Sequence, residues 1–124
     1  MTLLLDTHAL LWWLDGRRLD GAAKSAIADP QRLVLVSAVS IWEAAIKASL
    51  GKLTVPGSLR EAAEASGFDL LSITAEHAEV AGALPEVHRD PFDRMLVAQA
   101  MVEDCTIVSR DPVFGRYAVS TLIC

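Results

Sequence analysis

Short aliphatic runs alternate with longer amphipathic segments along the whole chain. Continuous aliphatic runs are typical of buried strands, and we expect strands at residues 2–5, 32–37, 68–73 and 105–109, with a further edge strand at 117–123. Between them, apolar residues recur three and four positions apart, which predicts helices over residues 7–16, 19–29, 39–50, 58–67, 74–84 and 90–100. No internal repeat and no linker-like block divides the chain.

Residues that commonly begin helices stand at the expected starts. Thr7 is the expected N-cap of the first helix, and Ser58 is the expected N-cap of the fourth. Asp90 followed by Pro91 is a favoured start for the last helix. These signals support the boundaries drawn from the hydrophobic pattern.

The alternation of strand and helix predicts an α/β fold, with a central, mostly parallel sheet flanked by helices on both faces in three layers. A chain of 124 residues fits one domain, over residues 1–124. In open sheets of this kind, ligands bind beyond the carboxyl ends of the strands. That edge is therefore the expected place of a functional site.

Composition narrows the class of protein further. Hydrophobic residues make up 52% of the sequence, yet the apolar runs are too short to span a bilayer and no basic stretch precedes the first one, so we expect a soluble protein without an export signal. Cys105 and Cys124 lack metal-ligand spacing and are expected as reduced thiols in the cytoplasm. A net charge of -5 argues against a protein that coats nucleic acid.

Two acidic residues follow predicted strands. Asp6 ends the first strand, and Asp111 comes shortly after the strand at 105–109. Either residue alone could merely cap the next helix, but Thr7 could take over that role beside Asp6. Both carboxylates are expected at the carboxyl edge of the sheet.

A third acid, Glu43, lies inside a predicted helix. Helical spacing places it on one face with Val39 and Ile46, toward the core. It also stands four residues before Lys47, so an ordinary surface ion pair is an equally open interpretation.

The segment DPFDR contains two acids with different explanations. Asp90 is accounted for as a helix cap. Asp93 shares its face of the helix with Leu96, Val97 and Ala100, and a carboxylate in an apolar layer is costly without a partner. If Asp93 converges with Asp6, Glu43 and Asp111, their like charges require a cation, and oxygen ligands suit Mg²⁺ or Mn²⁺.

Four stretches resemble the PIN-domain family, and within it the VapC-type toxins of type II toxin–antitoxin pairs. They are LLLDTHALLWWL, VSAVSIWEAAIK, HRDPFDRMLVAQA and IVSRDPVFGRY, which keep the family's order and together span the chain. The resemblance implies that the catalytic, metal-binding acids are Asp6, Glu43, Asp93 and Asp111. It implies supporting roles for Thr7, Ser109 and Asp90.

The resemblance also implies an activity and partners. The expected activity is that of a Mg²⁺- or Mn²⁺-dependent endoribonuclease, which hydrolyses RNA phosphodiester bonds with a Mg-activated water. A small VapB-like antitoxin and a homodimer are expected as well. Among the few basic residues, Arg94, Arg110 and Lys47 are the expected contacts to RNA phosphates. His8 and His88 have no visible partner and are interpreted as a helix-start and a loop residue.

An acidic pocket at the edge of such a sheet is also compatible with other functions. The main alternative is a partner-binding protein whose acidic pocket docks an arginine-bearing protein without cleavage, with Trp12, Trp13 and Trp42 as candidate interface residues. Receiver domains and haloacid-dehalogenase-type phosphatases also carry acids at strand ends. Both need a lysine in the later half of the fold, and no lysine follows Lys52.

Overall fold

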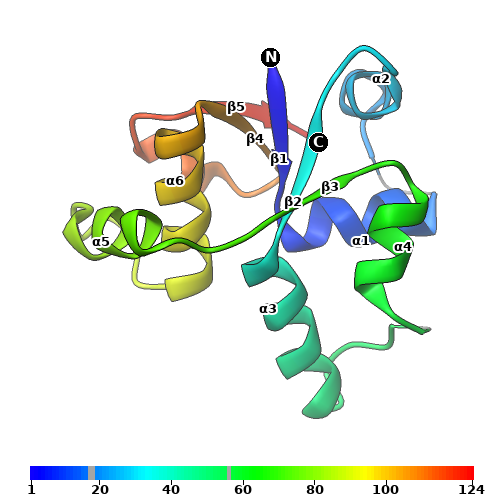
Figure 1. The fold of residues 1–124 in the computed structure, drawn as a ribbon, viewed down its shortest axis with the longest axis horizontal. Helices are drawn as coiled ribbons and strands as arrows, with labels where there is room; N and C mark the ends of the chain where they lie inside the picture. The colour runs from blue at the N-terminus through cyan, green and yellow to red at the C-terminus, as the bar shows by residue number, and fades with distance from the viewer. Residues whose placement is uncertain (17–18, 56) are drawn as a thin grey trace.

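Five parallel strands form the centre of the computed structural model, which describes residues 1–16, 19–55 and 57–124. Their order in the sheet is β3-β2-β1-β4-β5, and every pairing between these strands is parallel (Figure 1). The strands are β1 (Thr2–Leu5), β2 (Val34–Ser37), β3 (Asp69–Leu71), β4 (Cys105–Ser109) and β5 (Ser120–Ile123). The predicted parallel α/β fold is confirmed, and the predicted edge strand is β5.

Helices connect the strands and cover the sheet. They are α1 (Thr7–Asp15), α2 (Gly21–Ala28), α3 (Ala38–Ser49), α4 (Leu59–Ala65), α5 (Ala75–Ala83) and α6 (Pro91–Glu103), with a short 3₁₀ helix, η1 (Pro112–Arg116). In Figure 1, α5 and α6 lie on one side of the sheet, and α1 and α4 lie on the other. The three layers follow from the hydrophobic pattern, because a sheet with two apolar faces must be covered twice.

The alternation of side chains along β1 divides the core into two clusters. Leu3 and Leu5 point toward α1 and α2, where they pack with Leu10 and Ile27. Leu4 points the other way, in the cluster that contains the buried apolar residues of α6. All three leucines are fully buried, so β1 is the central strand of both cores.

One predicted cap is wrong. Thr7 does not cap α1; the Asp6 carboxylate does, because its Oδ1 accepts a hydrogen bond from the backbone N–H of Ala9 at 2.8 Å. Thr7 instead turns its hydroxyl toward α3. The predicted caps Ser58 and Asp90 are confirmed, each accepting hydrogen bonds from the first turn of its helix.

The carboxyl ends of β1 and β4 meet at one edge of the sheet. Leu5 pairs with Val108, and the backbone N–H of Asp6 donates to the carbonyl of Val108 at 3.1 Å. This register brings Asp6 beside Ser109, although 103 positions separate them in sequence.

No helix in the described part of the chain is long and apolar enough to cross a membrane. Cys105 and Cys124 are both buried and unpaired, as free thiols. Burial raises the pKa of both thiols, so neither is activated as a nucleophile.

Truncating the central strand should cost far more stability than truncating an edge strand. We expect Leu4→Ala to lower the free energy of unfolding by about 2–5 kcal/mol, because it opens a cavity in a fully packed layer. Leu70→Ala in β3, where the side chain is 41% exposed, is the matched control and should cost less than about 1 kcal/mol. Urea unfolding of both variants measures this, and equal losses would contradict the two-sided core.

Candidate functional site

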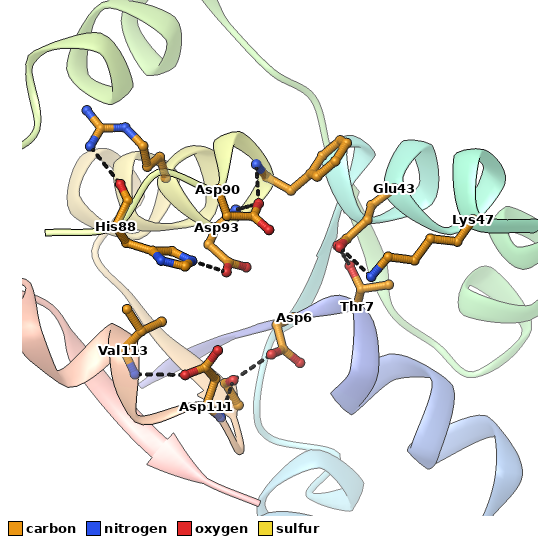
Figure 2. A network of polar contacts seen from close by, with 12 residues as sticks. Asp6, Thr7, Glu43, Lys47, His88, Asp90, Asp93, Asp111 and Val113 are labelled. Carbon is orange, nitrogen blue, oxygen red and sulfur yellow. Dashed lines mark hydrogen bonds and ion pairs between the residues drawn. The ribbon is translucent and has the colours of Figure 1, made fainter. Parts of the chain in front are cut away.

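A pocket of about 420 Å³ opens at the carboxyl edge of the sheet, and all four predicted acids line it. Asp6 comes from the end of β1, Glu43 from α3, Asp93 from α6, and Asp111 from the segment after β4 (Figure 2). The other lining residues are Thr7, His8, Trp12, Lys47, Asp90 and Arg110. Five carboxylates and three basic side chains therefore share one small cavity.

Asp6 is the most deeply set of the acids that follow strands. Its Oδ2 accepts a hydrogen bond of 2.5 Å from the hydroxyl of Ser109, and its Oδ1 caps α1. The residue is only 7% exposed, and burial raises the pKa of its carboxyl above the ordinary value. The negative charge of Glu43 adds to this rise, which means that the two acids interact electrostatically.

Glu43 both faces the core and forms an ion pair with Lys47, the two alternatives that the sequence left open. It is buried at 8% exposure on the core side of α3, and its Oε2 also pairs with the ammonium of Lys47 at 2.9 Å. The hydroxyl of Thr7 donates to its Oε1 at 2.5 Å. Glu43 is thus an inward-facing acid whose charge is already compensated by a cation.

Asp93 lies on α6 at the side of the pocket. Burial, together with the nearby charges of Asp90 and Glu43, raises the pKa of its carboxyl to about 6, although a hydrogen bond from His88 opposes this. The rise from 3.8 corresponds to about 3 kcal/mol of destabilisation of the ionised form. As the sequence predicted, the Asp93 carboxylate is unfavourably placed without a partner, and His88 contacts it.

The sequence pattern gave no role at the site to His8, which lines the pocket, or to His88, which contacts Asp93. His88 does stand in a loop, between α5 and α6, but its Nε2 lies 2.8 Å from Oδ2 of Asp93. Five positions separate the two residues, and nothing in the hydrophobic pattern reports how a loop folds back on the helix that follows it. Its position in the same motif as Asp90 and Asp93 was the only available signal.

The remaining two acids lie at the rim. Asp111 is exposed and caps η1 through a 2.9 Å hydrogen bond from the N–H of Val113. Asp90 caps α6 through hydrogen bonds from Phe92 and Asp93, as the sequence predicted, and also faces the pocket.

The three predicted phosphate contacts have different surroundings. Lys47 and Arg110 line the pocket. Arg110 stacks over the ring of Trp12 at 4.2 Å and donates to the carbonyl of Cys124 at 2.7 Å. Arg94, the third predicted contact, does not line the pocket; its guanidinium donates to four backbone carbonyls at the C-terminal end of α5 and in the following loop.

The donor set fits a divalent cation. Carboxylate oxygens from separate elements converge where burial and like charge raise the pKa of Asp6 and Asp93, so a bound cation would relieve an existing electrostatic cost. His88, Asp90 and Asp93 also present ligand atoms within 4.8 Å of one another. Oxygen ligands with at most one imidazole suit Mg²⁺ or Mn²⁺ better than zinc.

The acidic pocket lies beyond the carboxyl ends of the strands, which is where open parallel α/β proteins bind their ligands. A family model described as PIN domain matches residues 3–120. The chain is also 34% identical over 116 residues to Ribonuclease VapC22 of Mycobacterium tuberculosis, a match that covers 89% of this chain and 87% of that protein. The chain belongs to the PIN-domain family.

Two solved structures with the same fold come from toxin–antitoxin complexes. VapBC2 of Rickettsia felis, bound to a DNA fragment from its promoter, has a chain that superposes with a TM-score of 0.75 at 13% identity, covering 99% of this chain and 98% of that one. A toxin–antitoxin complex of Klebsiella pneumoniae gives a TM-score of 0.67 at 22% identity, covering 97% and 95%. At these identities the likeness concerns the fold.

The electrostatic cost at Asp93 predicts how stability depends on pH without metal. Between pH 3.8 and about 6 the folded protein holds a proton on Asp93 that the unfolded chain has lost, so stability should fall as pH rises through this window. Asp93→Asn should flatten that slope and raise the stability of the metal-free protein at pH 7 by about 1–3 kcal/mol. Asp90→Asn, which keeps a good cap, is the control and should change stability less.

Urea unfolding in EDTA at several pH values measures this. A lower stability of Asp93→Asn at pH 7 would contradict the assignment of Asp93 as a destabilised, ionised acid.

Proposed function

We propose that this protein is a metal-dependent endoribonuclease, the toxin of a toxin–antitoxin pair, and that residues 1–124 work as one ribonuclease domain. The observation that carries the proposal is the meeting of Asp6, Glu43, Asp93 and Asp111 in one pocket. Membership of the PIN-domain family and the 34% identity to a protein named a ribonuclease support it.

Asp6 and Asp93 would be the principal ligands of Mg²⁺ or Mn²⁺, because Asp6 is buried and Asp93 half-buried, both have a raised pKa, and neither has a lysine or arginine partner among the described residues. Asp111 and Glu43 would complete the set. When bound, such an ion activates water and offsets the charge that develops on a phosphodiester during hydrolysis.

The other pocket residues would orient these groups and the substrate. Ser109 fixes Asp6 and Thr7 fixes Glu43, each through its hydroxyl. Lys47 and Arg110 line the same pocket and are the cations nearest to where an RNA phosphate would lie. Since the whole chain carries a charge of -5, these two contacts would matter more than a general basic surface.

We also propose a VapB-like antitoxin, a homodimer and a place in the cytoplasm. The antitoxin is supported by the fold shared with chains of toxin–antitoxin complexes. Trp42 is 59% exposed and makes an edge contact with Phe92, so it is available to an interface. Trp13 packs against Phe68 at the edge of the core and is a poorer candidate.

Removing the charge of Asp6 or Asp93 should abolish RNA cleavage while the fold survives. We expect Asp6→Asn and Asp93→Asn to lower the cleavage rate more than about 100-fold, since even residues that only support metal ligands account for 10–100-fold. Asp90→Asn is the matched control, and it should keep most of the activity because asparagine remains a good cap. A gel assay on total RNA measures this.

Growth after induction in bacteria separates catalysis from the partner-binding alternative. Toxicity that disappears in the Asp6→Asn and Asp93→Asn variants supports catalysis. Toxicity that persists in both would instead support a pocket that docks an arginine-bearing protein without cleavage.

The chemistry of the cut ends is a further test. Hydrolysis by water should leave a 5′-phosphate and a 3′-hydroxyl and should stop in EDTA. Mapping the ends of cleaved RNA with and without EDTA measures this. Cyclic phosphate ends formed in EDTA would mean that the ribose 2′-hydroxyl is the nucleophile, and the proposal would be wrong.

A further inference from the structure

The guanidinium of Arg94 forms hydrogen bonds with the backbone at the end of α5 and in the segment between α5 and α6. Its Nη2 donates to the carbonyls of Ala81 and Leu84 at 2.9 and 3.0 Å, and its Nη1 donates to those of Pro85 and His88 at 3.0 and 3.2 Å. The planar guanidinium therefore links the last turn of α5 to three carbonyls of the following segment. These three hydrogen bonds from one side chain hold the loop in one conformation.

The same loop brings His88 to Asp93. The imidazole Nε2 lies 2.8 Å from Oδ2 of Asp93, and Figure 2 shows the ring directed at this carboxylate from the side opposite Glu43. When the Asp93 carboxylate is ionised it can only accept, and Nε2 then carries the proton and donates. Among the described residues no hydrogen bond reaches Oδ1 of Asp93, which leaves that oxygen for the pocket.

His88 is held by two neighbouring residues of α6. Asp93 and Arg94 are neighbours in the helix, and Arg94 holds the carbonyl of the residue whose side chain holds Asp93. Rotation of the Asp93 carboxylate would break the bond to His88, and movement of His88 would break the bond to Arg94. The geometry gives this carboxylate one orientation before any cation arrives.

We propose that His88, held in place by Arg94, is a positioning residue that fixes Oδ2 of Asp93 and so presents Oδ1 to the divalent cation. This role rests on the proposed function, because it assumes that Asp93 is a metal ligand. His88 is assigned to the support of the ligand and not to the ligand set, since its Nε2 is already used by Asp93. Carboxylates that bind metals are commonly oriented by such outer hydrogen bonds.

Binding of Mn²⁺ to the full-length protein tests the role without reference to RNA cleavage. We expect His88→Leu to weaken Mn²⁺ binding about 10–100-fold. His88→Gln should recover most of the affinity, because the glutamine amide can donate from nearly the same position as Nε2. Titration calorimetry measures the affinities, and thermal unfolding in EDTA checks that each variant is folded. Equal Mn²⁺ affinity in the wild type and a folded His88→Leu variant would overturn the proposal.

Electron spin echo spectroscopy of bound Mn²⁺ separates support from direct ligation. A positioning His88 leaves the spectrum of the wild type without the nitrogen coupling of a directly bound imidazole. Such a coupling, lost in His88→Leu, would overturn the positioning role and make His88 a ligand.

Two further variants test the role of Arg94 and the metal site itself. Arg94→Lys should weaken Mn²⁺ binding in the same direction as His88→Leu, since one ammonium cannot serve four carbonyls, and unchanged affinity in a folded variant would remove Arg94 from the proposal. Asp93→Asn shows whether Asp93 binds the metal at all. Unchanged Mn²⁺ binding in Asp93→Asn would refute the proposed metal site, whereas a loss there with no effect of His88→Leu would refute only the role of His88.

Discussion

The burial of like charges at the edge of an apolar sheet is the constraint on which the site depends. Asp6 continues the central strand, whose leucines are fully buried in two cores, and Asp93 extends from a helix packed on one of those cores. Neither carboxylate can be fully hydrated there, and the pKa of each is raised as a result. A bound cation would offset the electrostatic cost of keeping these two carboxylates ionised in the folded protein.

The fold makes this arrangement tolerable through hydrogen-bond donors taken from separate elements. Ser109 on β4 serves Asp6, Thr7 on α1 serves Glu43, and His88 in the loop before α6 serves Asp93. Hydrogen bonds of this kind satisfy a buried acceptor without cancelling its charge. Among the four acids, and within the described residues, Glu43 alone pairs with a lysine, so its charge is compensated more directly than that of the other three.

The periodicity of the chain was sufficient to predict the parallel sheet, its two covered faces and the role of Asp90 as a helix cap, because these follow from spacing alone. It was insufficient where the same residue spacing allows more than one set of side-chain contacts. Asp6 and Thr7 are both good caps, and only the position of α3 decides that Thr7 turns to Glu43. Arg94 stands next to an acid in sequence, yet its long side chain reaches carbonyls up to 13 positions away. His88 depends on a loop conformation that no pattern reports.

A crystal structure of the protein soaked in Mn²⁺ tests most directly whether this pocket is a divalent-cation site built on Asp6 and Asp93. Anomalous scattering locates the ion without reference to activity, RNA or a partner. We expect a peak within coordinating distance of both carboxylates, and its loss in crystals of Asp93→Asn. A pocket without an anomalous peak at a saturating Mn²⁺ concentration, or a peak bound by neither acid, would contradict this assignment.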